Sequence, residues 1–428
     1  MLTRIQIANL RNIAMQEIGD LSPVNVFLGD NGVGKTSVLE AIHTLGYGRS
    51  FRKQGGQKDA LVRYGCERLV VFGESVMGGS GSVRGDGQAL GVERMGLSRA
   101  ANGDIQIKIN GEKLQRLSEM AFRLPTIAVN SDTFDLLTGG AAERRRYLDW
   151  AVFHVEHGFR DVSKRYANAL QQRNSILRRI ANQMRLANPK NSSIDHDPHE
   201  LSTWTQAVSA LGAQVGEYRE AQFLVLRDLF EDMLRELGGG ALGVKLGYRS
   251  GWGQGVALAE ALEQGQISDM SRGFTQFGPH RADIQVVVGK DVAGQARLAR
   301  DVLSRGQLKL VVLAMKLAQV RFFLHAGSAG TLASKGARTE AGRDPQVQAL
   351  APAAGNTLSV LLDDIAAEFD RPRVVALGRL LAEMIMQGGV QVFATSTAIE
   401  PLKPLLDAIS IDDFKVFHVE HGRIWAAE

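Results

Sequence analysis

The chain has a single cysteine, Cys66, among its 428 residues. One cysteine excludes an intrachain disulfide framework and is typical of a reducing compartment. No run of about eighteen apolar residues occurs, which excludes an apolar membrane-spanning helix. The first residues, MLTRIQIANLRN, lack the charged start and apolar block of a secretory signal. We therefore expect a cytoplasmic protein with no membrane partner.

The net charge is small and unevenly distributed along the chain. The formal net charge is only +4, but residues 139–190 contain eleven Lys and Arg against four Asp and Glu, so the rest of the chain carries −3. A concentrated basic block indicates a polyanionic partner, although a solvated helical face is the simpler alternative. DNA contact and internal ion pairing both stay open for its residues and for a second basic stretch. The candidates are Arg144, Arg145, Arg146, Lys164, Arg165, Arg178, Arg179, Arg49, Arg52 and Lys53.

The order of the patterns predicts an α/β fold with a helical insertion. Residues 1–138 contain strand patterns and a turn signal at Asn110 and Gly111, which predicts a hairpin. Residues 139–240 are helical, and Arg173 occupies one place in an otherwise apolar stripe at three- and four-residue spacing. Strand patterns return in residues 241–428, where the Gly- and Ala-rich segment 326–356 predicts a mobile loop. The expected strands are 3–10, 24–29, 68–75, 104–111, 124–129, 241–250, 282–289, 357–364 and 390–397, with a final hairpin over 414–426.

The strongest motif is GDNGVGKTS, which satisfies G-x-x-x-x-G-K-[ST] and lies between a buried strand pattern and a helix pattern. In such a loop the backbone N–H groups surround phosphates, Lys35 reaches the outer phosphates and the Thr36 hydroxyl binds Mg²⁺. The sequence therefore predicts a nucleotide site. Its loop comprises Gly29, Asp30, Asn31, Gly32, Val33, Gly34, Lys35, Thr36 and Ser37.

A phosphate loop requires a carboxylate on the metal side. The apolar pattern LSVLLDD ends in Asp363 and Asp364. Asp363 is expected to hold Mg²⁺ through water, and Asp364 to orient or deprotonate the attacking water. Two solvated acids in a turn are the alternative, which the presence of a phosphate-loop motif in the same chain disfavours.

A second anion-facing segment occurs late in the chain, in VLSRGQLKL. The pattern predicts a strand end that enters a helix, with Ser304 at the helix start, where an anion could bind. Together with the two motifs above, this segment resembles the signature of the ATP-binding-cassette ATPases. The resemblance implies that Ser304, Arg305, Gly306 and Gln307 cap the ATP of a second copy, so that ATP forms a homodimer and hydrolysis releases it.

Further stretches narrow the resemblance to the RecF family of DNA-repair ATPases: LRNI, GDNGVGKTSVLEAIHTLGYGRSFR, AERRRYLDWAVFHVEHGF, QQRNSIL, FGPHRADI, LSRGQLKLVVLAMKLAQ and LLDDIAAEFD. The resemblance implies an ABC-type ATPase head with an inserted arm, which binds duplex DNA at gaps without sequence preference. With RecO- and RecR-type partners it would promote RecA loading and hydrolyse ATP weakly. It also implies that Arg11 contacts phosphate and that residues 367–370 run between two sites.

Three departures from the wider superfamily predict slow turnover. Asp364 replaces the usual Glu, Thr395 stands where transporters have a His, and Asn130 or Asp132 stands in for the sensor glutamine. Other ABC-type assemblies are the alternatives. A transporter ATPase would need a membrane partner, a long-arm chromosome or nuclease-partner ATPase would carry a far longer insertion, and a non-catalytic ATP-dependent scaffold stays open.

Overall fold

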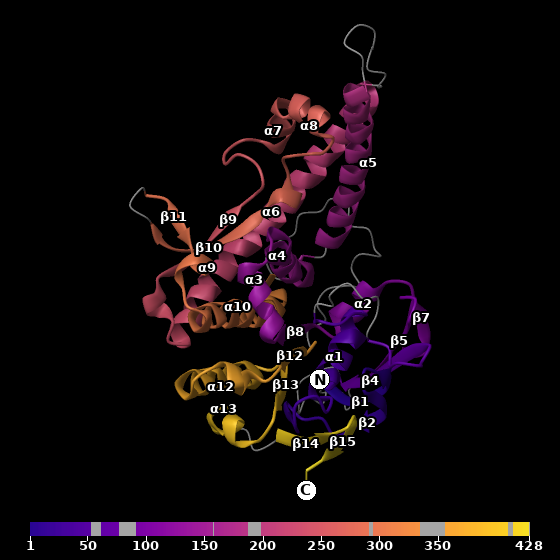
Figure 1. Ribbon diagram of the computed structural model, residues 1–428, viewed down its shortest axis with the longest axis vertical. Coiled ribbons are helices and arrows are strands. Elements are labelled where there is room, and N and C mark those ends of the chain that lie inside the picture. The colour runs from indigo at the N-terminus through magenta and orange to yellow at the C-terminus, as the bar shows by residue number, and fades with distance from the viewer. Residues whose placement is uncertain are drawn as a thin grey trace. The chain divides into compact units, whose positions relative to one another are not determined.

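The computed structural model describes residues 1–52, 61–76, 91–156, 158–186, 198–290, 294–333, 356–409 and 414–427. Lys53 and most of the predicted mobile loop lie outside the described residues. The chain forms two compact units (Figure 1). The first combines residues 1–134, 230–241 and 304–428, and the second combines residues 135–229 and 242–303. Residues 242–303 thus group with the arm, whereas the sequence-based division placed them with the head.

An antiparallel sheet forms one layer of the first unit, in the order β2-β1-β4-β5-β6-β7. Buried residues alternate with exposed or half-buried ones along β4, so one face is buried and the other is solvated. The predicted hairpin is confirmed, since β6 and β7 pair and Asn110 and Gly111 both have positive φ. The strands are β1 (Leu2–Leu10), β2 (Ile13–Ile18), β4 (Arg68–Val76), β5 (Val92–Ala100), β6 (Ile105–Ile109) and β7 (Glu112–Leu114).

The second layer is a mostly parallel sheet in the order β15-β14-β3-β13-β12-β8, in which only the β14–β15 pair is antiparallel. Every residue of β3, β12 and β13 is buried, which explains their near-continuous apolar sequences. The strands are β3 (Val24–Leu28), β8 (Thr126–Val129), β12 (Leu358–Leu362), β13 (Val390–Ser396), β14 (Phe414–Glu420) and β15 (Arg423–Ala426).

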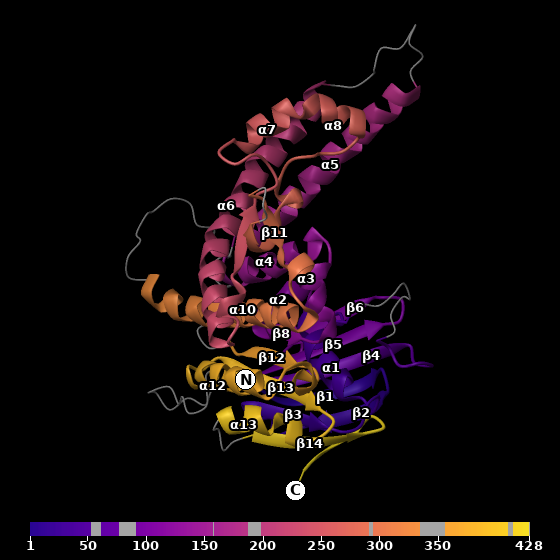
Figure 2. The same cartoon turned by 60° about the vertical axis from the view of Figure 1, so that its left-hand side comes forward.

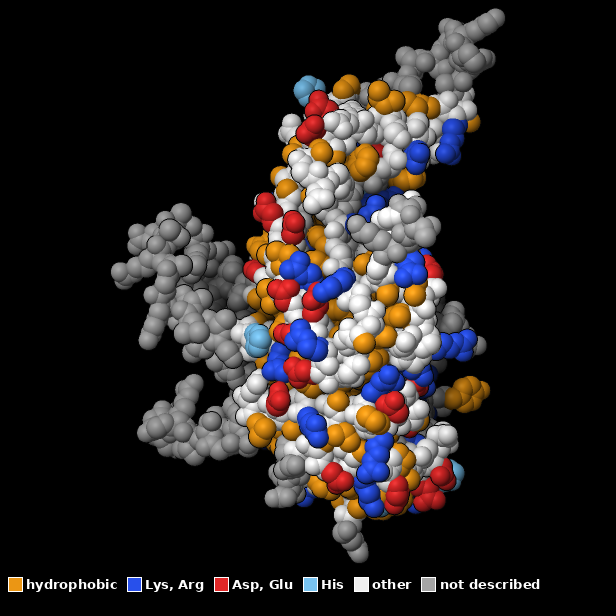
Figure 3. All heavy atoms as spheres, turned by 90° about the vertical axis from the view of Figure 1, so that its left-hand side faces the viewer, with side chains coloured by type: hydrophobic (Ala, Val, Ile, Leu, Met, Phe, Trp, Pro, Cys, Tyr) orange, Lys and Arg blue, Asp and Glu red, His pale blue; other side chains and the backbone are white. Residues whose placement is uncertain are grey.

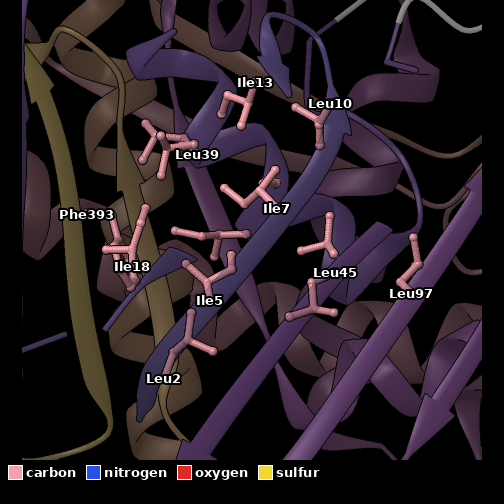
Figure 4. Packing of buried hydrophobic residues seen from close by; sticks show 14 of the residues in the cluster. Leu2, Ile5, Ile7, Leu10, Ile13, Ile18, Leu39, Leu45, Leu97 and Phe393 are labelled. Atoms are coloured by element: carbon pink, nitrogen blue, oxygen red, sulfur yellow. The ribbon is translucent and has the colours of Figure 1, made fainter. Parts of the chain in front are cut away.

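Helix α1 (Lys35–Tyr47) packs against strands of both layers (Figure 2). Leu2, Ile5, Ile7 and Leu10 lie one after another along β1 (Figure 4). They belong to one buried cluster with Leu39 and Leu45 of α1 and Phe393 of β13. This core fixes α1, and with it the preceding loop, against the parallel sheet. The other helical segments are α2 (Leu117–Arg123), η1 (Ser131–Phe134), α10 (Arg305–Ala333), α11 (Ile365–Glu368), α12 (Arg371–Met386), η5 (Glu400–Leu402) and α13 (Lys403–Ile409).

The second unit contains the predicted arm helices and a three-stranded antiparallel sheet, β11-β10-β9. Helix α6 ends at Glu236, just before the glycines at 238–240, as the sequence predicted. The elements are α3 (Asp135–Thr138), α4 (Ala141–Val155), α5 (Phe159–Leu186), α6 (Pro198–Glu236), η2 (Gly240–Leu242), β9 (Val244–Arg249), α7 (Leu258–Gln264), α8 (Gln266–Arg272), η3 (Pro279–Arg281), β10 (Asp283–Lys290), β11 (Ala296–Leu298) and α9 (Ala299–Val302). The last residues of α6 and the first two of η2 belong to the first unit.

One local prediction was wrong. The residues before Ser304 form the short helix α9 followed by one extended residue, Leu303, and not a strand end. The apolar residues of this stretch are too few to distinguish one helical turn from a strand by periodicity. Among the described residues, no helix is both long enough and apolar enough to cross a membrane.

Candidate functional site

Three neighbouring parallel strands end at the same edge of the sheet. Gly29 follows β3, Asp363 follows β12, and Thr395 lies near the end of β13, the strand between them. In open α/β sheets, ligands bind outside the carboxyl ends of the strands. The sheet order thus brings the predicted phosphate loop and the predicted acids to one place.

The phosphate loop requires its glycines. Gly29 and Gly34 have φ of 156° and 120°, which is unfavourable for residues with a side chain. A Cβ on Gly34 would lie 2.7 Å from Asn12 Nδ2, and a Cβ on Gly29 would lie 2.2 Å from the Val419 carbonyl oxygen. The Asn12 amide also donates to the Val33 carbonyl at 2.7 Å. The loop is therefore held on both sides by neighbouring segments of the first unit.

Lys35 folds back over this loop. Its Nζ donates to the carbonyl oxygens of Gly29 at 2.6 Å and Asp30 at 2.8 Å. Burial lowers the pKa of the Lys35 ammonium, and the carboxylates of Asp364, Asp363 and Asp30 oppose that shift. The arrangement holds a cation at the start of α1, where the helix dipole also favours a bound phosphate.

Thr36 and Asp363 lie in direct contact. The Thr36 hydroxyl donates to Asp363 Oδ1 at 2.8 Å, and the Thr395 hydroxyl donates to the same oxygen at 2.9 Å. Hydroxyl and carboxylate oxygens are the hard donors that Mg²⁺ prefers, and Mg²⁺ commonly takes its other ligands from phosphates and water. The described residues contain no group of three or more His, Cys, Asp and Glu side chains suited to a metal. The donors present fit a magnesium ion that arrives with a phosphate ligand.

Asp364 has an unusual backbone conformation. Its φ of 52° and ψ of 37° are left-handed, and its N–H donates to the Thr395 hydroxyl at 2.9 Å. Asp364 lines a cleft together with the phosphate loop. The empty volume of this cleft, open solvent included, is about 880 Å³. Its lining residues are Asn31, Gly32, Gly34, Lys35, Thr36, Ser37, Arg52, Ser131, Asp363, Asp364, Glu368 and Thr395.

The cleft includes residues that sequence reasoning did not assign to it. Ser131 lines it, whereas Asn130 exchanges hydrogen bonds with Thr133 and caps the η1 turn. Arg52, considered above as a DNA contact or an internal ion-pair partner, also lines the cleft. Position alone could have indicated Ser131, because it follows β8, whose carboxyl end lies beside that of β12.

Arg11 does not line the cleft. Its guanidinium pairs with Glu40 of α1 at 2.9 and 3.1 Å, and its φ is 54°. Glu40 is almost completely buried and also accepts a hydrogen bond from Ser50. The phosphate contact predicted for Arg11 stays a prediction, and the contact that the structure provides is this ion pair.

The late signature also lies outside the lining of this cleft. The Ser304 hydroxyl accepts from the Gln307 N–H at 3.3 Å, and the Gln307 side chain accepts from the Ser304 N–H at 2.9 Å. This reciprocal pair is a capping box at the start of α10. Ser304, Arg305 and Gly306 are exposed. One helical turn further on, Lys309 forms an ion pair with Glu368, a cleft residue.

The basic residues of the second unit divide into paired and unpaired ones. Arg144 makes a bidentate ion pair with Asp283, and Arg145 donates to the Ala282 carbonyl. Lys164 and Arg165 are exposed and have no ion pair or side-chain hydrogen bond with any described residue. Internal pairing therefore accounts for Arg144 and Arg145. On the face drawn in Figure 3, basic and acidic side chains are interspersed, so charge there does not single out one patch.

Comparison with known proteins shows to which family the chain belongs. The profile of the family described as RecF/RecN/SMC N terminal domain matches residues 1–416. The DNA replication and repair protein RecF of Chromohalobacter salexigens is 36% identical over 427 residues, covering 99% of each chain. The protein of the same name from Pseudomonas aeruginosa (strain UCBPP-PA14) is 33% identical over 425 residues, covering 99% of this chain and 97% of its own. The chain belongs to the RecF family.

Solved structures agree with this assignment at the level of the fold. The RecF-family chain superposes on a structure of the recombination mediator protein RecF with ATP, from the RecFOR pathway, with a TM-score of 0.73 and 21% identity, covering 100% and 97% of the two chains. An Smc head domain from Pyrococcus furiosus gives a TM-score of 0.53 at 12% identity, with 100% and 95% covered. The predicted fold class, an ABC-type P-loop ATPase head with a mixed sheet and an inserted helical arm, is confirmed.

Proposed function

We propose that the chain is an ATP-dependent, DNA-binding recombination mediator. In this proposal two copies pair around ATP and Mg²⁺, and the dimer binds duplex DNA at gaps. With RecO- and RecR-type partners it then promotes RecA loading, and slow ATP hydrolysis acts as a timer. The observation that carries the proposal is the convergence of the phosphate loop with Thr36 and Asp363, in a chain whose relatives are named DNA replication and repair proteins.

The nucleotide would displace hydrogen bonds already present in the loop. Lys35 gives up the carbonyls of Gly29 and Asp30 and donates to the outer phosphates, which offer more negative charge. Thr36 and Asp363 would hold the magnesium ion, which neutralises developing charge on the phosphates. Asp364 would orient the attacking water and accept its proton.

The position of the signature supports pairing of two copies. Residues 304–306 are exposed and lie outside the lining of the cleft in their own chain. The capping box still leaves the other N–H groups of the first turn of α10 available to an external acceptor. A second copy would present this turn to the γ-phosphate, so ATP would bridge the two chains.

Helix α5 supplies the surface proposed for DNA. Residues 162–186 contain no Asp or Glu, and Lys164, Arg165, Arg178 and Arg185 are exposed along the helix. Lys164 and Arg185 are separated by about 31 Å at 1.5 Å per residue, close to the roughly 34 Å of one turn of duplex DNA. Such contacts reach phosphates and are blind to sequence, as a factor that meets random gaps requires.

Sedimentation of the full chain with and without ATP and Mg²⁺ tests the pairing. The chain is expected to be monomeric alone and dimeric with the nucleotide. Ser304→Arg should bind ATP and stay monomeric, whereas Ser271→Arg, at an exposed serine outside the signature, should still pair. A chain that stays monomeric in saturating ATP would refute the proposal. A dimer that never releases phosphate would leave the non-catalytic scaffold as the correct class.

Fluorescence anisotropy with gapped and plain duplexes across a salt series tests the DNA surface. Affinity should rise with ATP, favour gapped duplexes and fall steeply with salt. The double change Lys164→Glu and Arg165→Glu should weaken binding to all sequences and reduce the slope of log affinity against log salt by about two. The matched control, Arg227→Glu with Arg235→Glu, makes the same charge change on α6 at two residues that are already ion-paired, and should bind as the unchanged chain does. Equal losses in both variants would contradict the assignment of α5.

A further inference from the structure

Thr395 lies at the centre of the site, although the sequence identified it only as a residue that replaces the histidine of transporters. It lies on β13, between the strand that leads to the phosphate loop and the strand that leads to the acids. Its exposed fraction is 0%. Within the parallel sheet, Thr395 pairs with Phe27 of β3, and the preceding residue, Ala394, pairs with Leu362 of β12. The side chain therefore starts from the one strand that adjoins both halves of the site.

The hydroxyl of Thr395 makes two hydrogen bonds with opposite roles. It donates to Asp363 Oδ1 at 2.9 Å and accepts from the Asp364 N–H at 2.9 Å. One oxygen atom thus links the side chain of the first acid to the backbone of the second. A valine of the same shape could make neither bond.

Both hydrogen bonds hold groups that could otherwise adopt another conformation or orientation. The left-handed conformation of Asp364 is uncommon for a residue with a side chain and needs support from its surroundings. The carboxylate of Asp363 also accepts from Thr36, but that hydroxyl would turn to the metal when a nucleotide binds. Thr395 would then be the hydroxyl that still holds Asp363.

We propose that Thr395 is a positioning residue, which fixes the Asp363 carboxylate toward the metal position and the Asp364 carboxylate toward the cleft. It acts through these two acids and does not itself contact the nucleotide. The inference rests on the function proposed above. The simpler account is that Thr395 fills a buried space between strands, and that shape alone matters.

Two substitutions separate the hydroxyl from the shape. Thr395→Val keeps the shape and removes both hydrogen bonds, whereas Thr395→Ser keeps the hydroxyl and removes a methyl group. Ser359→Ala is the matched control, because Ser359 is a buried hydroxyl on the adjacent strand β12 whose oxygen has no hydrogen-bond partner among the described residues. Affinity for a fluorescent ATP analogue is measured in EDTA and across a Mg²⁺ series, alongside steady-state ATP hydrolysis.

Thr395→Val should bind the analogue in EDTA within about twofold of the unchanged chain. Its half-saturating Mg²⁺ should rise, and its kcat should fall, by about ten- to a hundredfold, since loss of a group that orients a metal ligand typically has effects of this size. Its KM for ATP should stay within about threefold. Thr395→Ser and Ser359→Ala should resemble the unchanged chain in all of these measurements.

Each outcome decides the inference. Thr395→Val with unchanged Mg²⁺ dependence and kcat would overturn it, as would equal losses in the valine and serine variants, which would show that packing matters and the hydroxyl does not. The unchanged chain separates this from a failure of the proposed function. If that chain shows no Mg²⁺-dependent ATP affinity, the proposed function and the inference both fall. If it does and Thr395→Val matches it, only the inference falls.

Discussion

Arg173 offers a test of how the arm keeps a charge in its interior. Its side chain and that of Asp269 are both completely buried and form an ion pair at 2.8 Å. The Arg173 guanidinium also donates to Thr275 Oγ1 at 2.7 Å and Thr205 Oγ1 at 3.0 Å. Arg173→Met keeps an unbranched apolar stem of similar reach but leaves the carboxylate without its cation.

The size of the effect follows from what remains around Asp269. Among the described residues, only the backbone and side-chain N–H groups of Gln276 still donate to it, at 3.1 and 3.0 Å. Removing one partner of a buried ion pair typically costs about 3–5 kcal/mol. The second unit has about 160 residues. For chains of this size the thermal midpoint of unfolding falls by about 2–4 °C for each kcal/mol of stability lost, so the midpoint of this unit should fall by about 6–20 °C.

Thermal and urea denaturation, each followed by tryptophan fluorescence, measure the midpoint and the free energy of unfolding. Three of the four tryptophans, Trp150, Trp204 and Trp252, belong to the second unit, so the signal reports mainly on that unit. Arg178→Met is the matched control on the same helix, where the side chain is exposed and, within the described part of the chain, donates only to a backbone carbonyl. It should change the free energy of unfolding by less than about 0.5 kcal/mol.

Arg173→Met combined with Asp269→Asn should recover much of the loss, because no charge is then left unpaired. The reasoning is refuted if Arg173→Met unfolds within about 1 kcal/mol of the unchanged chain, or if the double change is no more stable than the single one.

Three further predictions concern the head and the acid response. Lys35→Met should lose ATP binding, measured by titration with a fluorescent ATP analogue, and ATP-dependent pairing with it. Asp364→Asn should keep ATP binding and retain the dimer, while phosphate release in single-turnover assays falls by about ten- to a thousandfold; normal release would place the base elsewhere. Burial lowers the pKa of His280 to about 4. Because the unfolded chain then takes up a proton that the folded chain does not, the second unit should lose stability as the pH falls from about 6.5 to about 4, and His280→Gln should flatten that dependence in urea titrations at stepped pH.

Local sequence patterns were enough to predict the phosphate loop and the acidic strand end. The glycine spacing of residues 29–34, followed by Lys35 and Thr36, matches the pattern of a phosphate loop, and apolar runs before Gly29 and Asp363 are typical of buried parallel strands. The same holds on the arm, where the periodic stripe of α5 placed Arg173 on the apolar face, and the structure buries it there. These features depend on residues within a few positions of one another, so the sequence could specify them.

Tertiary structure decided which distant residues meet. Thr395 bonds to Asp363 because β13 lies between β3 and β12, and no local pattern states the order of strands in a sheet. The resemblance implied a phosphate contact for Arg11, and for Arg144 the sequence left DNA contact and internal pairing both open; in the structure each is paired with an acid well separated from it in sequence, Glu40 and Asp283. An arginine is the same letter in the sequence whether its guanidinium faces solvent or a buried carboxylate. The choice between them is made by packing, because only the folded chain brings the compensating charge within hydrogen-bonding distance.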